Sequence, residues 1–136
     1  MILAITLVSL TIITIKNIAP KREGYNFERD AVYFLKNHNV QMDKVFLVTT
    51  KMVYYATEQR KEFVRNDTWA YTKQAIDNKS IFAYDYLLIL LDVNNQLASR
   101  EQILATQLHQ YELIKEFYSL KKKKKIKIYH KKIIQK

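Results

Sequence analysis

The sequence predicts a small three-layer α/β domain with a mostly parallel sheet of three or four strands, preceded by an N-terminal transmembrane helix. Three observations lead to this prediction. The first 15 residues carry no charge. Short runs of consecutive apolar residues, which suit strands covered on both faces, occur farther along the chain. Segments with the apolar spacing of helices lie between these runs, and such alternation indicates βαβ units.

Composition limits the kinds of protein to consider. The chain has 136 residues, which fits a single domain. It contains no cysteine, so disulfides and cysteine-based zinc sites are excluded. The net charge of +10 is unevenly distributed, because residues 121–136 hold nine lysines and no acidic residue. The basic character therefore belongs to the C-terminal segment rather than to the whole domain.

Residues 1–19 are predicted to hold the chain in a membrane. The uncharged run ends at Ile15, slightly short of the ~17–20 residues of a spanning helix, so it resembles the exit half of a span. Two alternatives remain: a cleaved signal peptide, although no basic residue precedes the run, and a buried strand, although strands usually have about 3–10 residues. The expected anchor residues are Ile2, Leu3, Ile5, Leu7, Val8, Leu10, Ile12, Ile13 and Ile15.

The charges after the apolar run bear on topology. Lys16, Lys21 and Arg22 follow the run, and no basic residue precedes it. The positive-inside rule therefore favours a cytoplasmic location for the remainder of the chain. A polar linker is expected over residues 20–26, and it leads into an α/β domain over residues 27–130.

The first half of the domain is predicted to alternate between helices and strands. Asn26 is suited to cap a helix over residues 27–38, in which Phe27, Ala31, Phe34 and Leu35 share one face. A strand over residues 44–50 (KVFLVTT) follows. The next elements expected are a helix over residues 52–59 and a short strand over residues 62–65.

The second half contains the clearest strand. A helix is expected over residues 68–78, followed by a strand over residues 85–93 (DYLLILLDV) whose unbroken apolar core indicates the centre of a sheet. A long helix should open at Ser99. A final strand is expected over residues 125–130 (KIKIYH), and residues 131–136 form a basic tail. The apolar stripe expected on the long helix consists of Leu104, Leu108, Tyr111, Ile114 and Tyr118.

The chain offers no recognisable catalytic, cofactor-binding or metal-binding motif, and no cofactor is expected. Ligands of parallel α/β sheets bind at the carboxyl ends of strands, where this sequence has ordinary polar residues. Its only glycine, Gly24, precedes the first helix, so a phosphate-binding loop is not expected. The three histidines lack the spacing of a metal pair. The polar residues at strand ends are Thr49, Thr50, Lys51, Asp92 and Asn94.

Five consecutive lysines mark a candidate contact surface. Lysines near an anionic leaflet each contribute about 1 kcal/mol to binding, so anionic lipid is one partner to consider. Nucleic acid is less well supported, because the segment from 121 onward has one aromatic residue and no arginine. A third interpretation is a basic edge strand whose lysines prevent edge pairing. The candidate lipid contacts are Lys121, Lys122, Lys123, Lys124 and Lys125.

The order of elements resembles a known family. An apolar span leads to a helix (DAVYFLKNHN), a strand (KVFLVTT), a helix with a Tyr-Tyr pair (MVYYATEQR) and an apolar strand (YDYLLILLD). This arrangement is similar to the C-terminal end of multi-spanning glycosyltransferases that use lipid-linked sugars, of the dolichyl-phosphate-mannose protein mannosyltransferase and aminoarabinose transferase type. The resemblance implies a small extracytoplasmic α/β domain after the last span, in contrast to the local charge bias.

The resemblance leads to a functional expectation. The family's catalytic acid lies in a loop after its first span, and no position here corresponds to that loop. The chain is therefore expected to be a non-catalytic C-terminal domain, or a fragment, of such an enzyme, with membrane lipid and either an upstream transmembrane region or another membrane protein as partners. The alternative is a stand-alone interaction module anchored in a membrane, and a nucleic-acid-binding protein is a third hypothesis.

Overall fold

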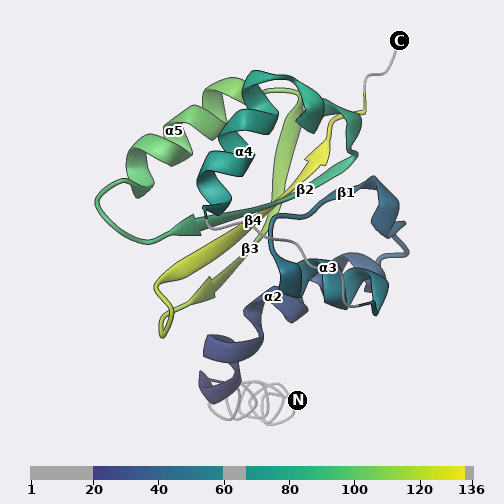
Figure 1. Cartoon of the computed structure of the whole chain (residues 1–136), viewed down its shortest axis with the longest axis vertical. Helices are drawn as coiled ribbons and strands as arrows, with labels where there is room; N and C mark the ends of the chain where they lie inside the picture. Colours follow the sequence, from purple (N-terminus) through teal and green to yellow (C-terminus); the bar gives the residue numbers. More distant parts are fainter. Residues whose placement is uncertain (1–19, 60–66, 134–136) are drawn as a thin grey trace, which may run out of the picture.

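The computed structural model describes residues 20–59 and 67–133, which form an α/β fold around a four-stranded sheet (Figure 1). The α/β class expected from the sequence is confirmed. The helices and strands are α2 (Pro20–Asn37), η1 (Met42–Lys44), β1 (Val45–Phe46), α3 (Thr50–Thr57), α4 (Thr68–Asp77), η2 (Ser80–Ala83), β2 (Tyr86–Asp92), α5 (Leu97–Gln107), β3 (Tyr111–Ser119) and β4 (Lys124–Lys131), where η denotes a short 3-10 helix.

The sheet is mixed, so the prediction of a mostly parallel sheet is wrong. Its strand order is β1-β2-β4-β3. β1 and β2 are parallel, whereas β4 is antiparallel to both of its neighbours, β2 and β3. It follows that β1, β2 and β3 all run in one direction, as successive βαβ units require. β4 then inserts between β2 and β3 in the opposite direction.

The error arose from one missed strand. The predicted long helix is two elements: α5 ends at Gln107, and Tyr111 begins β3. The expected stripe does continue through Leu104, Leu108 and Tyr111, which are buried. Farther on it fails, because Ile114 and Tyr118 are 38% and 44% exposed on an edge strand. The four-residue turn after β3 returns the chain antiparallel to it, and this reversal gives the sheet its mixed character.

The predicted central strand is confirmed as β2. It pairs with β1 on one side and along its whole length with β4 on the other. Leu88 and Ile89, which point to opposite faces, are both fully buried. Helices lie on both sides of the sheet: α4 and α5 on one side, α2 and α3 on the other (Figure 1). Both faces of β2 are therefore covered, as its apolar run predicted.

The two faces of β4 differ in chemistry. Ile126 and Ile128 are fully buried, and Phe117, the cross-strand partner of Ile126, contacts Phe34 of α2. The alternate residues Lys125 and Lys127 face α5 instead. β4 thus has an apolar face toward α2 and a lysine-bearing face toward α5, so it is an interior strand rather than the basic edge strand considered as an alternative.

The first described helix begins where a linker was expected. α2 starts at Pro20 and is broken at Asn26, whose φ/ψ values of −119° and 15° are not helical. From Phe27 onward the helix buries Phe27, Ala31 and Leu35 against the sheet, as predicted. Among the residues that the structure describes, no helix is both long and apolar enough to cross a membrane. The predicted transmembrane segment over residues 1–19, with all its anchor residues, and the strand expected over residues 62–65 lie outside the described residues.

Two short helices follow the predicted pattern with different caps. α3 is capped by Thr49, whose Oγ1 accepts a hydrogen bond from the Met52 N–H at 3.1 Å. α4 is capped by Asp67, whose Oδ1 accepts a 3.1 Å hydrogen bond from the Ala70 N–H. These caps satisfy backbone donors that have no partner inside the helix. The cap at Thr49 also fixes the start of α3, whose first turn contains Lys51.

Candidate functional site

The topology brings lysines from distant parts of the sequence to one edge of the sheet. The parallel strands β1 and β2 end at this edge, and the antiparallel strand β4 begins there. Lys51 lies in the first turn of α3, shortly after β1, whereas Lys124 begins β4. Asp92, at the end of β2, is opposite Lys124 in the register, and their charged groups are 3.8 Å apart.

Lys122 is the centre of this group. It lies in the turn between β3 and β4, and its Nζ is 5.5 Å from the centre of the Phe27 ring in α2. Its backbone N–H donates to the Ser119 Oγ at 3.2 Å, which holds the turn in place. Burial, and then the charge of nearby Lys51, lower the pKa of Lys122 below its ordinary value. The Lys51 ammonium group therefore lies close enough to Lys122 to disfavour its protonated form.

A carboxylate of α2 only partly offsets this charge. Glu28 is 9% exposed and lies close enough to Lys122 to favour its protonated form. Its Oε2 accepts a 2.6 Å hydrogen bond from the hydroxyl of Thr49, and this bond links α2 to the residue that caps α3. We use the name basic end for the five lysines gathered here, near which Glu28 and Asp92 also lie. The basic end consists of Lys51, Lys121, Lys122, Lys123 and Lys124.

The five lysines predicted as one lipid-contacting run lie in two different surroundings. Lys121, Lys122 and Lys123 occupy the β3–β4 turn, whereas Lys124 and Lys125 are strand residues. Lys125 turns away from the basic end toward α5, where its Nζ lies 3.3 Å from Glu101 and 3.7 Å from Glu116. Lys51 takes its place in the basic end. The sequence did not single out Lys51 as a partner of this run, but the meeting of strand ends at one edge is the pattern that could have found it.

Beneath α5, a separate charge cluster forms around a nearly buried lysine. The Lys127 side chain is 9% exposed, and its Nζ contacts Glu101 at 2.6 Å and Glu116 at 3.2 Å. Burial alone would lower the pKa of Lys127, but its hydrogen bonds to Glu101 and Glu116 raise it overall. The hydrogen bond from Lys127 in turn holds the pKa of Glu101 below its ordinary value. With Lys125 the cluster has two charges of each sign, so it reads as a structural link between α5 and the sheet.

The other polar residues at strand ends have local structural roles. Thr49 caps α3 and donates to Glu28, while the Asn94 Oδ1 accepts from the Gln96 N–H at 2.9 Å before α5 begins. Asp92 faces Lys124 with about half of its side chain exposed. These residues shape the edge of the sheet.

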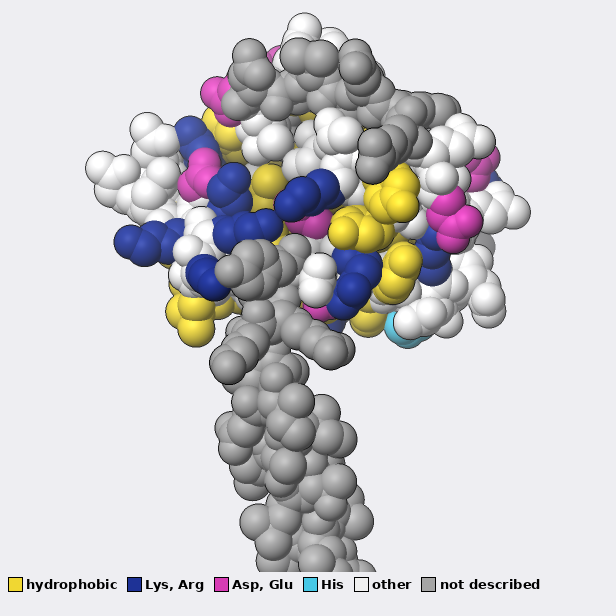
Figure 2. Space-filling view, turned by 60° about the horizontal axis from the view of Figure 1, so that its bottom comes forward, with side chains coloured by type: hydrophobic (Ala, Val, Ile, Leu, Met, Phe, Trp, Pro, Cys, Tyr) yellow, Lys and Arg dark blue, Asp and Glu magenta, His cyan; other side chains and the backbone are white. Residues whose placement is uncertain are grey.

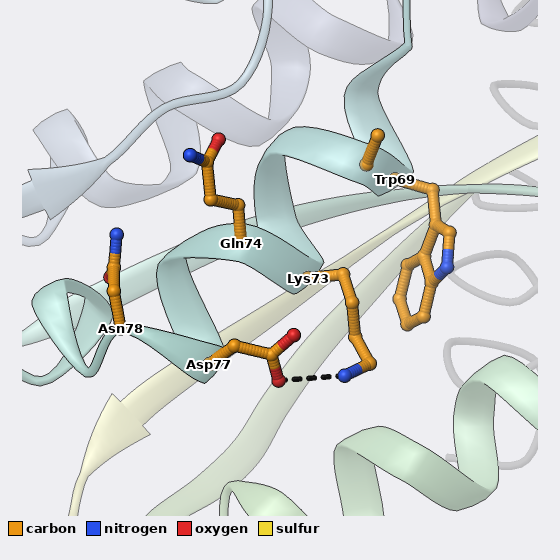
Figure 3. Close-up of a pocket in the computed structure, with 6 residues that line it drawn as sticks. Trp69, Lys73, Gln74, Asp77 and Asn78 are labelled. Carbon is orange, nitrogen blue, oxygen red and sulfur yellow. Dashed lines mark hydrogen bonds and ion pairs between the residues drawn. The ribbon is translucent and has the colours of Figure 1, made fainter.

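A shallow hollow of about 570 Å³ lies along the outer side of α4 (Figure 3). Trp69 stands at one end of it, and Lys73 and Asp77 are joined by a 2.7 Å ion pair between successive turns. The Arg100 guanidinium lies 5.2 Å from the Trp69 ring. Since its charged groups are already paired along one helix, the hollow presents no excess charge or converging donors to a ligand. Its lining residues are Trp69, Ala70, Lys73, Gln74, Asp77 and Asn78.

The histidines lie apart from one another in the part of the chain that the structure describes. His38 Nδ1 is 2.6 Å from the Phe34 carbonyl oxygen, and His130 stacks on Tyr86 with ring centres 4.4 Å apart. His109 is exposed in the turn before β3. Over residues 20–59 and 67–133, no three His, Asp or Glu side chains are grouped to hold a metal ion. The basic end therefore remains the most distinctive charged surface of the described residues.

Comparison with known proteins finds no match, so any functional conclusion depends on the geometry described above. No family model matches the sequence, and neither a curated protein nor a solved structure shows significant similarity to it.

Proposed function

We propose that this chain is a non-catalytic α/β domain held at a membrane by its N-terminal apolar segment, and that it serves a glycosyltransferase of the type that uses lipid-linked sugars. Two lines of reasoning support the proposal. The apolar run and the order of elements resemble the C-terminal end of those enzymes. The structure adds the position of α2, the helix that directly follows the apolar segment.

The position of α2 is the observation that carries the proposal. α2 begins at Pro20, only a few residues after the uncharged run ends at Ile15. Its later turns are part of the core, where Phe27 and Leu35 are 2% and 1% exposed. An apolar segment joined so closely to a core helix would keep the domain near the surface of the bilayer, because little chain is left to act as a spacer.

The proposal makes the apolar segment the membrane anchor. After extraction of cell membranes with alkaline carbonate, the chain should remain in the pellet. A Leu7→Lys/Leu10→Lys variant is the control, because each lysine at the centre of a spanning segment costs roughly 2.5–3.5 kcal/mol on insertion scales. Release of the unmodified chain into the carbonate wash would contradict an integral anchor.

The size of the native polypeptide distinguishes the terminal domain of a multi-spanning enzyme from a stand-alone module. An antibody against the α/β domain should detect a membrane protein much larger than 16.3 kDa, the mass of this sequence, if the domain ends a multi-spanning enzyme. A membrane-bound band of about this mass would instead favour a stand-alone interaction module. One structural feature favours that second candidate: β3 is an edge strand with Leu113, Ile114 and Tyr118 each more than a third exposed.

The side of the membrane is a further part of the proposal. The family resemblance favours an extracytoplasmic domain, whereas Lys16, Lys21 and Arg22 favour the cytoplasm. Because the chain has no cysteine, a His109→Cys variant offers a single thiol at an exposed position. Labelling by a membrane-impermeant maleimide in intact cells would support the extracytoplasmic location, and labelling only after lysis would support the cytoplasmic one.

A further inference from the structure

The turn between β3 and β4 begins with an exposed apolar residue, which three lysines follow. Leu120, in this turn of four residues, is 73% exposed although its side chain is apolar. Lys121, Lys122 and Lys123 follow it directly. An exposed apolar side chain surrounded by positive charge is the combination that interfacial membrane contacts use, since the apolar group enters the acyl boundary while the lysines meet phosphate groups.

The turn is held in one conformation by its own hydrogen bonds. Besides the bond from the Lys122 N–H to Ser119, the Val93 N–H donates to the Lys123 carbonyl oxygen at 2.7 Å. Ser119 itself is fully buried, which fixes the base of the turn in the sheet. Leu120 therefore projects from a rigid hairpin, so its exposure is a built feature of the fold.

The same end of the molecule receives the N-terminal segment. Lys122 lies over the Phe27 ring of α2, so the turn is packed beside the first core residues of that helix. Figure 1 shows the β3–β4 turn and the start of α2 at the same end of the fold. Figure 2 views the molecule from that side, with Lys and Arg side chains gathered over it and hydrophobic side chains next to them. An anchor attached at Pro20 would thus bring the turn toward the lipid surface.

The charges at this end are arranged to favour an anion. Lys51 and Lys122 converge beside α2, and burial together with the charge of Lys51 disfavours the protonated form of Lys122. A phosphate group between these side chains would relieve that cost, because it would add negative charge to that of Glu28, which alone leaves the pKa of Lys122 lowered. Leu120 favours a lipid surface over a free phosphate or a nucleic-acid backbone, because neither of these offers an apolar layer that its side chain can enter.

We propose that the basic end of the domain rests on an anionic lipid surface, with Leu120 entering the interface and Lys51, Lys122 and Lys123 contacting lipid phosphate groups. The inference rests on the membrane anchor proposed above, and it adds a second attachment with a definite ligand chemistry. An anchor alone leaves the domain free to tilt. A second contact at the β3–β4 turn fixes which end of the domain is turned toward the bilayer.

The test uses the full chain with one added thiol, because the sequence has no cysteine. A Leu120→Cys variant carries an environment-sensitive NBD label and is reconstituted in vesicles of phosphatidylcholine, with or without roughly 30% phosphatidylglycerol. We expect a blue shift of the label's emission that is larger in the anionic vesicles and partly reversed by about 0.5 M NaCl. A His109→Cys label, at the other end of β3, should remain in an aqueous environment in both.

A charge-reversal pair provides the matched control. Adding Lys51→Glu and Lys123→Glu to the labelled variant should abolish the extra blue shift in anionic vesicles. Lys79→Glu and Lys132→Glu, two exposed lysines near the opposite end of the sheet, make the same change in net charge and should leave the shift intact. Unchanged circular dichroism of each variant confirms that folding is preserved.

Flotation with the vesicles separates the outcomes. If the chain floats with both kinds of vesicle but the label at position 120 stays aqueous, the lipid contact is overturned while the anchor stands. Flotation only with anionic vesicles, reversed by salt, would support the contact and overturn the anchor. Equal blue shifts in neutral and anionic vesicles, insensitive to charge reversal, would overturn the role of the lysines. A response to a single-stranded oligonucleotide but not to vesicles would assign the basic end to nucleic acid instead.

Discussion

Two groups of lysines that lie next to each other in the sequence have opposite roles. Lys125 and Lys127 of β4 are 16% and 9% exposed and are paired with Glu101 and Glu116, whereas Lys123 in the turn is exposed. The difference comes from the period of the strand, since alternate residues of β4 face α5, where carboxylates meet them. A lysine run is therefore not a functional unit; the residues facing each lysine decide whether it stabilises the fold or is available to a partner.

The largest effect is expected where a charge is introduced into β2 without such a partner. Leu88→Asp places a carboxylate on the face toward α2, opposite Ile128, and should cost about 4 kcal/mol or more. Ile89→Asp lies opposite Lys127 on the other face, so it should cost about 1–2 kcal/mol less. Urea denaturation of both variants tests this, and an unchanged stability of either one would contradict the coverage of both faces of β2.

The paired lysines should differ from the turn lysines when each is replaced by methionine. Lys127→Met leaves two carboxylates close together with only Lys125 to balance them, and should reduce the free energy of unfolding by about 2 kcal/mol. Lys123→Met, the matched change in the turn, should alter it by less than about 0.5 kcal/mol. Equal losses in the two variants would remove the distinction between the two groups.

The pH dependence of stability should also reflect the ion pair between Lys127 and Glu101. The pKa of Glu101 is lowered in the folded state, so its contribution is present above the unfolded value of 4.5 and is lost as the pH falls through the folded value. The pKa of Lys127 is raised, so its contribution is present below 10.5 and is lost as the pH rises through its folded value. Denaturation measured across pH should thus show the cost of Lys127→Met shrinking at both extremes; a constant cost would argue against the ion pairs.

The smallest expected effect concerns the backbone of the turn. Lys123 has a φ of 51°, in the left-handed region that costs other residues energy but suits glycine. Lys123→Gly should therefore stabilise the domain by roughly 0.5–1 kcal/mol, while Lys123→Ala should not. Thermal denaturation of the two variants separates the backbone contribution from the loss of the charge.

Much of the fold could be predicted from local patterns. The unbroken apolar run of β2 indicated a central strand, and the spacing of Phe27, Ala31 and Leu35 identified the buried face of α2. β3 was missed because its apolar residues continue the helical spacing of α5, while Leu113 and Phe117 equally suit a strand. Whether this segment forms a helix or a strand depends on β4, which needs a second antiparallel neighbour. Such a long-range requirement is not visible in the local sequence.

The candidate site was only partly predictable for the same reason. The sequence identified the turn lysines but grouped them with Lys125, because the strand was expected to begin there and its facing residues were unknown. Lys51 was noted only as a polar residue after a strand. Its meeting with Lys122 depends on β4 running antiparallel to β2, which became evident only once the β3–β4 hairpin was known.

The strand order also has a consequence for how the protein is made. β2 pairs with β1 over only two residues, whereas β4, more than thirty residues later in the chain, pairs with its full length. During synthesis, Leu87–Leu91 leave the ribosome well before their main partner exists. The domain must therefore acquire its core in one late step, after nearly all of the described chain has been translated. Until then β2 can be covered only by other elements, among them α4 and α5, which are translated before β4.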